Sequence, residues 1–100
     1  MDFDQYQQEI AEYGDKFTAN HQPGWELFLA TGLCEEAGEV TALIRKAHRR
    51  GIPVGANSLA EELGDVLCYV AYIAHRYDLS LEKIASENIN YKVKTNHHVQ

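Results

Sequence analysis

Apolar residues recur along most of this chain at spacings of three and four, which is the period of a helix with one buried face. No segment shows the strict alternation that is typical of a half-buried strand. The pattern is interrupted by short stretches rich in Gly, Pro, Asp and Ser. We therefore expect four helices, covering about residues 3–17, 23–50, 58–77 and 81–89.

The expected boundaries rest on start and stop signals. Pro23 suits the first turn of the second helix, because the N–H that proline lacks has no partner in that turn. Gly51 stands where a left-handed residue ends a helix, and Pro53 follows it. Ser58 and Glu61 have the spacing of a capping box, which predicts that the third helix begins at Ser58.

Four helices with short connections predict a single all-α domain over residues 1–100, built as an antiparallel four-helix bundle. The third helix is apolar nearly all round between Val66 and Ala74, so we expect it to be buried on more than one side. A second subunit would then cover an outer face that carries Tyr69, Tyr72 and Arg76. Residues 95–100 show no pattern, which predicts a mobile tail.

Composition and charge narrow the possible partners. The net charge of −6 argues against a nucleic-acid duplex, whose phosphates need a basic surface. The longest apolar run, VLCYVAYIA, is shorter than the roughly 20 residues that span a bilayer, so no membrane partner is expected. The first residues, MDFDQYQQ, do not resemble a signal peptide. A cytoplasmic location is the resulting expectation.

The most informative motif occurs twice, as EEAGEV over 35–40 and EELGDV over 61–66. Glu36 shares a helix face with Glu39, and Glu62 shares one with Asp65, because residues three apart are neighbours on a helix. A helical hairpin can bring the two pairs opposite each other. Four such carboxylates repel one another by several kcal/mol at an effective dielectric of ~20, so a cation is expected there. Oxygen-only ligands favour Mg²⁺, with Mn²⁺ as a possible substitute.

These acids have two other interpretations. They could be solvated faces of surface helices that bind no metal. A di-iron carboxylate site is disfavoured, because such sites use Glu-x-x-His pairs and the chain has none. Gly38 and Gly64 lie inside the two motifs, although glycine in a helix costs roughly 1 kcal/mol relative to alanine. We therefore expect a helix or a ligand to come close to both glycines.

The paired acids, with the flanking GLCEEAGEV, LIRKA, EELGDVLCYVA and LSLEKIASENI, resemble the MazG-like nucleoside triphosphate pyrophosphohydrolases over about residues 29–89. The resemblance implies an all-α fold that works as a dimer or tetramer. It implies Mg²⁺-dependent hydrolysis of a (deoxy)nucleoside triphosphate between the α and β phosphates, giving a monophosphate and pyrophosphate. It also implies that the metal ligands are Glu36, Glu39, Glu62 and Asp65. Glu35 matches the extra acid beside the first pair and is our candidate for the general base.

The fourth helix departs from that family pattern. Relatives tend to carry Asn-Ile-x-Lys and an arginine four residues later, whereas here Asn88-Ile89 precedes Asn90-Tyr91 and Thr95 holds the arginine position. Lys92 lies four residues after Asn88 and is the candidate replacement on the substrate phosphates, with Lys94 nearby. The missing arginine leaves an alternative, a catalytically inactive nucleotide- or metal-binding regulatory module of the same fold. A helical interaction domain without metal is the third hypothesis.

Other substrate-binding candidates each have a structural explanation. Arg45 and Lys46 either complement the C-terminus of the second helix or reach a triphosphate. Trp25, together with Phe17 and Phe28, either packs in the core or stacks on a base.

Overall fold

The computed structural model describes residues 1–94, so the predicted tail over 95–100 lies outside the described residues. The described chain is entirely helical, which confirms the predicted fold class. Four α-helices are joined by short connections, with a 3₁₀ turn after the first and a π-helical turn after the last. They are α1 (Phe3–Gly14), η1 (Thr18–His21), α2 (Trp25–Arg50), α3 (Ala56–Arg76), α4 (Leu81–Ile89) and η2 (Asn90–Lys94).

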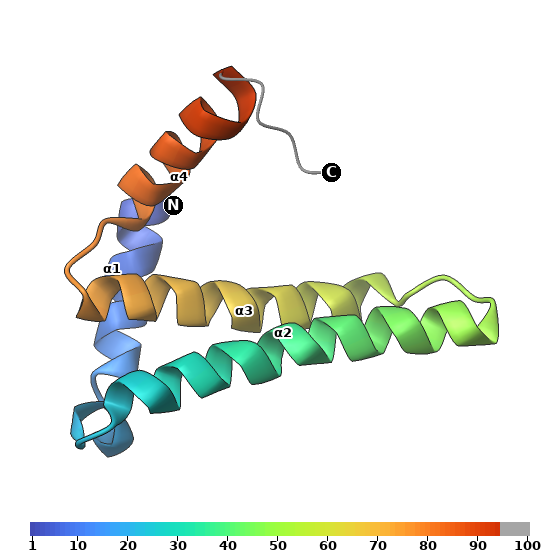
Figure 1. The fold of residues 1–100 in the computed structure, drawn as a ribbon, viewed down its shortest axis with the longest axis horizontal. Helices are drawn as coiled ribbons and strands as arrows, with labels where there is room; N and C mark the ends of the chain where they lie inside the picture. The colour runs from blue at the N-terminus through green and yellow to red at the C-terminus, as the bar shows by residue number, and fades with distance from the viewer. Residues whose placement is uncertain (95–100) are drawn as a thin grey trace.

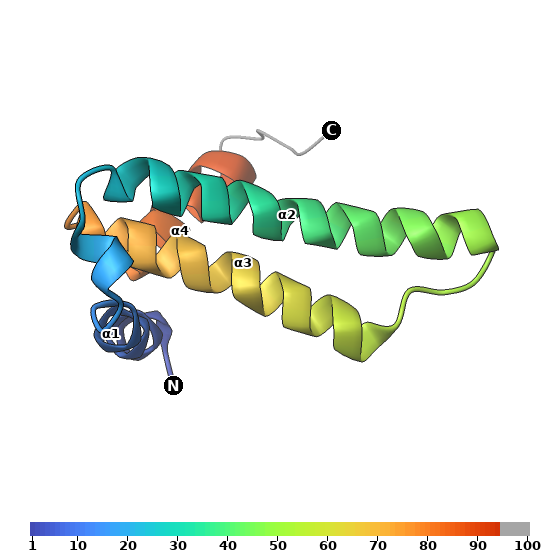
Figure 2. The same ribbon diagram turned by 90° about the horizontal axis from the view of Figure 1, so that it is seen from below.

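The two long helices, α2 and α3, form an antiparallel hairpin, and the other two helices lie across it (Figure 1). Figure 2 shows α1 end-on beneath the hairpin, at the end where α2 begins and α3 finishes. From the same end α4 runs away from the hairpin, in contact with α1 and α3. The antiparallel arrangement is thus seen for α2 and α3 but does not extend to a closed four-helix bundle within one chain.

The direction of α4 is determined by contacts with α1. The side chain of Gln7 donates a hydrogen bond to the carbonyl oxygen of Leu79 at 2.8 Å and accepts one from the N–H of Leu81 at 2.9 Å. Ser80 caps the helix by accepting from the N–H of Lys83 at 3.1 Å. These bonds satisfy polar groups that the start of a helix leaves without partners, so they hold α4 against α1.

Two of the predicted helix starts are wrong by two residues. Gly24, at φ +88°, adopts a conformation that glycine reaches without strain and precedes α2, so Pro23 lies outside the first turn. The third helix begins at Ala56 after an extended Gly55, so Ser58 lies within the helix and not at its cap. The prediction for the end of α2 is confirmed, since Gly51 has φ +66°.

The predicted first helix is also too long, because α1 ends at Gly14 and Phe17 follows it outside the helix. The carbonyl oxygen of Gly14 accepts hydrogen bonds from the backbone N–H of Phe17 and from the side-chain amide of Asn20. These bonds turn the chain into η1 in place of another α-helical turn. Phe17 therefore does not belong to α1, although its spacing from the apolar residues of α1 fits a helix.

Tyr69, Tyr72 and Arg76 do not form an outer face, contrary to the prediction. Tyr72 is only 4% exposed and packs on Gly14 of α1, while Tyr69 packs on Gly32 of α2. The guanidinium of Arg76 donates to the carbonyl oxygen of Asn20. The prediction failed because α1 and η1 fold across this side of α3 and cover it.

The interior of a single chain is small. The buried apolar side chains are Ala11, Leu29, Ala71, Tyr72, Ala74 and Leu81, which gather where α1, α2 and α4 meet the second half of α3. Large apolar side chains elsewhere are exposed, including Leu27, Ile44, Leu63, Leu67, Ile84 and Ile89. A core of this size is marginal for a domain of 100 residues. The exposed apolar surface supports the expectation of a second subunit, which stays a prediction.

The glycines of α1 and α2 differ in what surrounds them. A Cβ atom on Gly14 would lie 2.3 Å from Cε1 of Tyr72, whereas a Cβ on Gly38 would meet nothing within 4 Å. The same is true of Gly64. The expectation that a helix of this chain comes close to Gly38 and Gly64 is therefore wrong for the described residues. A ligand at either glycine stays a prediction.

We predict opposite effects for alanine at these two sites. Tyr72 is buried and its hydroxyl is bound to Asp15, so it has little room to yield to a new methyl group. Gly14→Ala should therefore lower the free energy of unfolding by about 1–3 kcal/mol. Gly38→Ala, the matched control, should leave it unchanged or raise it by about 0.5–1 kcal/mol. Urea denaturation without added metal measures both, and equal effects would contradict the prediction.

Candidate metal centre and adjoining pocket

Three acidic side chains meet between the helices of the hairpin. Glu36 projects from α2, and Glu62 and Asp65 project from α3 one turn apart. One carboxylate oxygen from each lies within 4.8 Å of the other two. Glu36 and Glu62 are partly buried and Asp65 is exposed. The antiparallel register of α2 and α3 thus places both halves of the repeated motif at one point.

Two acids of this cluster, Glu36 and Glu62, have a raised pKa. Partial desolvation and the charges of Asp65, Glu62, Glu39 and Glu35 raise the pKa of Glu36 above its ordinary value. Partial desolvation raises the pKa of Glu62 as well, together with the charges of Asp65, Glu39 and Glu61. Both directions mean that the folded chain disfavours the ionised form of these groups.

No side chain neutralises the cluster among residues 1–94. The ion pairs of this region join His75 to Asp15 and Lys83 to Glu87, and neither touches the acids of the hairpin. Three unneutralised carboxylates within reach of one point are the donor set that hard divalent cations take. The residues present therefore fit the divalent metal that the sequence predicted, with Glu36, Glu62 and Asp65 in position to hold it.

The two remaining acids of the first motif lie at the margin of the cluster. Glu39 is exposed on the next turn of α2 and does not belong to the group of three, although its charge acts on both Glu36 and Glu62. Glu35 is exposed beside Glu36 and acts on it electrostatically. The roles of Glu39 as a ligand and of Glu35 as a base stay predictions.

A pocket of about 360 Å³ opens beside the acids and extends to α1 and η1. Glu36 and Asp65 line one part of it, and Asn20 of η1 also contributes to the lining. Its aromatic lining comes from Tyr13, Phe17, Phe28, Tyr69 and Tyr72. Sequence reasoning considered Phe17 and Phe28 as stacking residues but missed Tyr13 and Asn20. No motif marked those two, because they lie at the end of α1 and in an irregular turn.

Tyr69 places a neutral hydroxyl next to the acids. Partial burial raises the pKa of this phenol, and the nearby charges of Glu36, Cys68, Glu35 and Asp65 raise it further. Tyr69 therefore keeps its proton well above neutral pH and can donate a hydrogen bond within the pocket. The packing of its ring on Gly32 of α2 fixes its position.

A polar junction holds η1 and the end of α1 on α3. The hydroxyl of Tyr72 donates to a carboxylate oxygen of Asp15 at 2.8 Å, and Nε2 of His75 lies 3.4 Å from the other oxygen. Partial burial alone would raise the pKa of Asp15, but the Tyr72 hydrogen bond and the charges of His75 and His21 outweigh it and lower that pKa. The junction therefore stabilises the wall of the pocket most fully while Asp15 is ionised.

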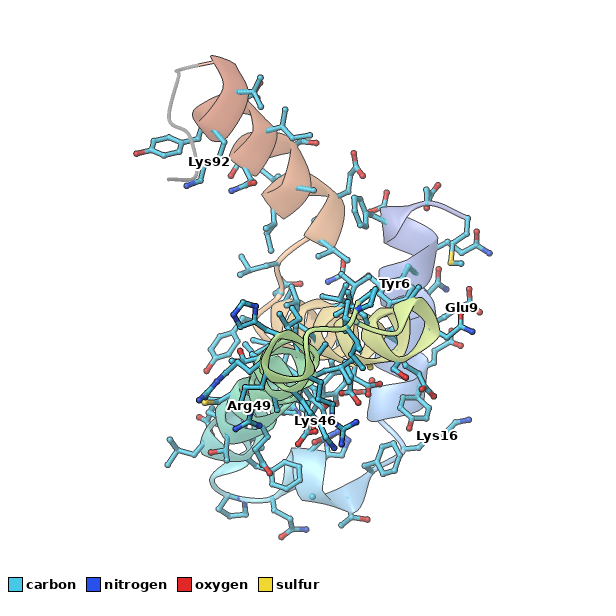
Figure 3. All side chains as sticks on the ribbon, turned by 90° about the vertical axis from the view of Figure 1, so that its right-hand side faces the viewer. Tyr6, Glu9, Lys16, Lys46, Arg49 and Lys92 are labelled. Carbon is cyan, nitrogen blue, oxygen red and sulfur yellow. The ribbon has the colours of Figure 1, made fainter. Side chains whose placement is uncertain are left out.

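The remaining candidates lie away from this pocket. Trp25 is covered by the guanidinium of Arg76, 3.8 Å from the ring centroid, and by Tyr77 at 5.6 Å. Arg45 and Lys46 are exposed toward the far end of α2, where Figure 3 shows Lys46 near Arg49. Asn88 and Lys92 belong to α4 and η2, and Figure 3 shows Lys92 well apart from Lys46. None of these five lines the pocket in the described residues.

Comparison with known proteins identifies the family. The chain matches the family described as the MazG nucleotide pyrophosphohydrolase domain over residues 26–99. Because this match covers most of the sequence, the protein belongs to the MazG nucleotide pyrophosphohydrolase domain family. The resemblance seen over about residues 29–89 is therefore confirmed, and it extends further at both ends.

A phage protein is also similar to this chain. The Gene 37 protein of Mycobacterium phage L5 is 36% identical over a 67-residue alignment, which covers 63% of this chain and 59% of the phage protein. The chain thus covers less than two thirds of that relative, whose name states no activity. No solved structure is significantly similar to the chain. Within residues 1–94, none of the helices combines the length and the apolar character needed to cross a membrane.

We predict that neutralising Glu36 stabilises the metal-free protein. Because the folded-state pKa of Glu36 is raised, its ionised form destabilises the fold at neutral pH, and stability returns as the pH falls through that pKa. Glu36→Gln should therefore melt at a higher temperature than the wild type at pH 7 in a chelator. The difference should shrink as the pH falls through the raised pKa of Glu36 and vanish below about pH 4.3, the ordinary pKa of glutamate.

Glu9→Gln is the matched control for this experiment, since Glu9 is exposed on α1 and shows no interaction with the cluster. Its melting temperature should stay close to that of the wild type across the same pH range. A Glu36→Gln protein that is less stable at pH 7, or whose gain does not depend on pH, would contradict the repulsion argument.

Proposed function

We propose that this protein is a Mg²⁺-dependent hydrolase that cleaves a (deoxy)nucleoside triphosphate between the α and β phosphates. The products are a nucleoside monophosphate and pyrophosphate. The observation that carries the proposal is the meeting of Glu36, Glu62 and Asp65, with no cationic partner among residues 1–94, in a chain that belongs to the MazG family. The adjoining aromatic pocket supports it, because a nucleotide substrate needs room beside the metal centre.

Each group has a defined task in the proposed reaction. Glu36, Glu62 and Asp65 would hold the cation, with Glu39 one turn away as the fourth ligand. When bound, Mg²⁺ neutralises phosphate oxygens that an acidic protein would otherwise repel. Glu35 accepts the proton of the attacking water while the water oxygen bonds to phosphorus and the α–β bridging oxygen leaves. The exposed position of Glu35 beside Glu36 leaves it accessible to water.

We further propose that the working form is a homo-oligomer, a dimer or tetramer, in the cytoplasm. The exposed Leu63 and Leu67 of α3 and Ile84 of α4 support this, because a second copy would remove them from water. Asn88, Lys92, Arg45 and Lys46 are separate from the acids of their own chain. Another copy could bring them to the site and let them contribute to phosphate binding.

A second candidate function is a nucleotide- or metal-binding module without hydrolysis. It is favoured by the departures in the fourth helix and by the position of Lys92 on η2, which lies beyond α4 and away from the hairpin (Figure 1). Phosphate binding without a nearby lysine or arginine would depend on the metal alone. The two candidate functions share the metal centre and differ only in whether the nucleotide is hydrolysed.

Our first prediction for this function concerns the products. Wild-type protein with Mg²⁺ should release pyrophosphate from at least one member of a panel of NTPs and dNTPs, and release should stop in a chelator. Asp65→Asn should abolish it, whereas Asp4→Asn, an exposed acid on α1, should not. Absence of pyrophosphate across the whole panel would favour the binding module, and release of single orthophosphate would contradict the α–β assignment.

A further prediction separates Glu35 from Glu36. A general base contributes typically 10²- to 10⁴-fold to the rate, so Glu35→Gln should lower kcat by at least about 10²-fold with little change in Mg²⁺ affinity. Glu36→Gln should weaken both, since Glu36 lies in the cluster itself. Single-turnover rates and calorimetric titration with Mg²⁺ measure the two quantities. Equal loss of affinity would make Glu35 a ligand, and an unchanged rate would make it a bystander.

A further inference from the structure

Asn20 carries an unused hydrogen-bond acceptor in the wall of the pocket. The residue is only 6% exposed, and its side-chain Nδ2 donates to the carbonyl oxygen of Gly14 at 2.8 Å. This bond fixes the orientation of the amide, and no described residue donates to Oδ1. Since no fully buried side-chain polar atom of the described chain lacks a partner, Oδ1 must be open to solvent. Asn20 lines the pocket, and we infer that Oδ1 opens into it.

The position of Asn20 is held from a second direction. Its backbone carbonyl oxygen accepts a hydrogen bond from the guanidinium of Arg76, which itself stacks on Trp25. The preceding residues are tied to α3 through the bond between Asp15 and Tyr72. An amide that is buried and held at both its side chain and its backbone is preorganised, so a ligand would meet it without a large loss of entropy.

Flat apolar surfaces lie around the same cavity. Tyr13 and Phe17 form an edge-to-face pair with ring centroids 5.1 Å apart, and they remain 55% and 48% exposed. Phe28 of α2 is also exposed and lines the pocket. Exposed aromatic rings beside a fixed polar group suit a planar heterocycle, which stacks on the rings and uses its edge for hydrogen bonds.

We propose that this pocket binds the nucleobase of a nucleotide, with Asn20 Oδ1 accepting an N–H from the base edge and Tyr13 and Phe17 stacking on its face. The pocket volume of about 360 Å³ is at the lower end for small-molecule sites, so it holds a base and sugar but not the triphosphate as well. Glu36 and Asp65 line the same cavity, so the phosphates leave it toward the cation. Only this last point rests on the proposed function.

The test measures binding of nucleoside 5′-monophosphates by calorimetry, in a chelator, so that it needs neither metal nor hydrolysis. A panel of CMP, UMP, AMP and GMP identifies the tightest base. Asn20→Ala should weaken the binding of that nucleotide by roughly 5- to 10-fold, which corresponds to the loss of one hydrogen bond. Asn57→Ala, an exposed asparagine at the start of α3, is the matched control and should bind as the wild type does.

Two further measurements protect the test against a misfolded Asn20 variant. On the wild-type protein, an analogue whose edge N–H groups are methylated should bind more weakly than the parent nucleotide. Phe17→Leu, a change at an exposed position, should weaken the binding of every nucleotide by roughly 5- to 150-fold, because stacking on the base is lost. Folding of each variant is checked by its melting temperature.

The outcomes separate this inference from the proposed function. Nucleotide binding that depends on Asn20 and Phe17, in a protein that releases no pyrophosphate, would uphold the base pocket and overturn the hydrolase. If the wild type, Asn20→Ala and Phe17→Leu all release pyrophosphate with the same KM for every base, the hydrolase is upheld and the base pocket is overturned. If Phe17→Leu changes the oligomeric state in sedimentation but not nucleotide binding, the aromatic rim belongs to a subunit interface and the base pocket is wrong.

Discussion

The contact of Tyr72 with the end of α1 positions α1 and η1 on the hairpin of α2 and α3. The ring of Tyr72 occupies the space that a side chain at Gly14 would need, and its hydroxyl binds Asp15. The chain therefore turns at the base of the hairpin and returns as η1 instead of continuing as a helix. This turn places Asn20 beside the acids of α2 and α3, and it creates the pocket.

The acidic cluster works against the stability of the chain that carries it. Glu36 and Glu62 lose part of their hydration and repel Asp65, and no cationic side chain in the described part of the chain relieves them. The two long helices hold these groups together, because α2 and α3 share the most extensive contact between elements of the described chain. Preorganised repulsion of this kind favours a divalent cation, since binding removes an unfavourable interaction of the folded state.

The parts of the fold that follow from local sequence could be predicted, and the parts that depend on long-range contacts could not. Helical periodicity and the spacing of Glu36, Glu62 and Asp65 are local, and the hairpin brought those acids together as expected. The courses of α1 and α4 depend on single side chains such as Tyr72 and Gln7, whose partners lie far away in sequence. Periodicity also could not tell which side of the apolar α3 is covered by its own chain.

The candidate site shows the same division. The metal-centre residues carried a repeated motif, whereas Asn20 stands in a four-residue turn with no periodicity to distinguish it. The two halves of the pocket consequently differ in how freely they can change. The carboxylates belong to the two long helices that pack against each other as the hairpin, whereas η1 is held by a few side-chain bonds at its edges. Mutation in that turn can alter the shape and polarity of the wall without unfolding the hairpin, so descendants of such a chain could acquire new ligands while inheriting the same acidic cluster.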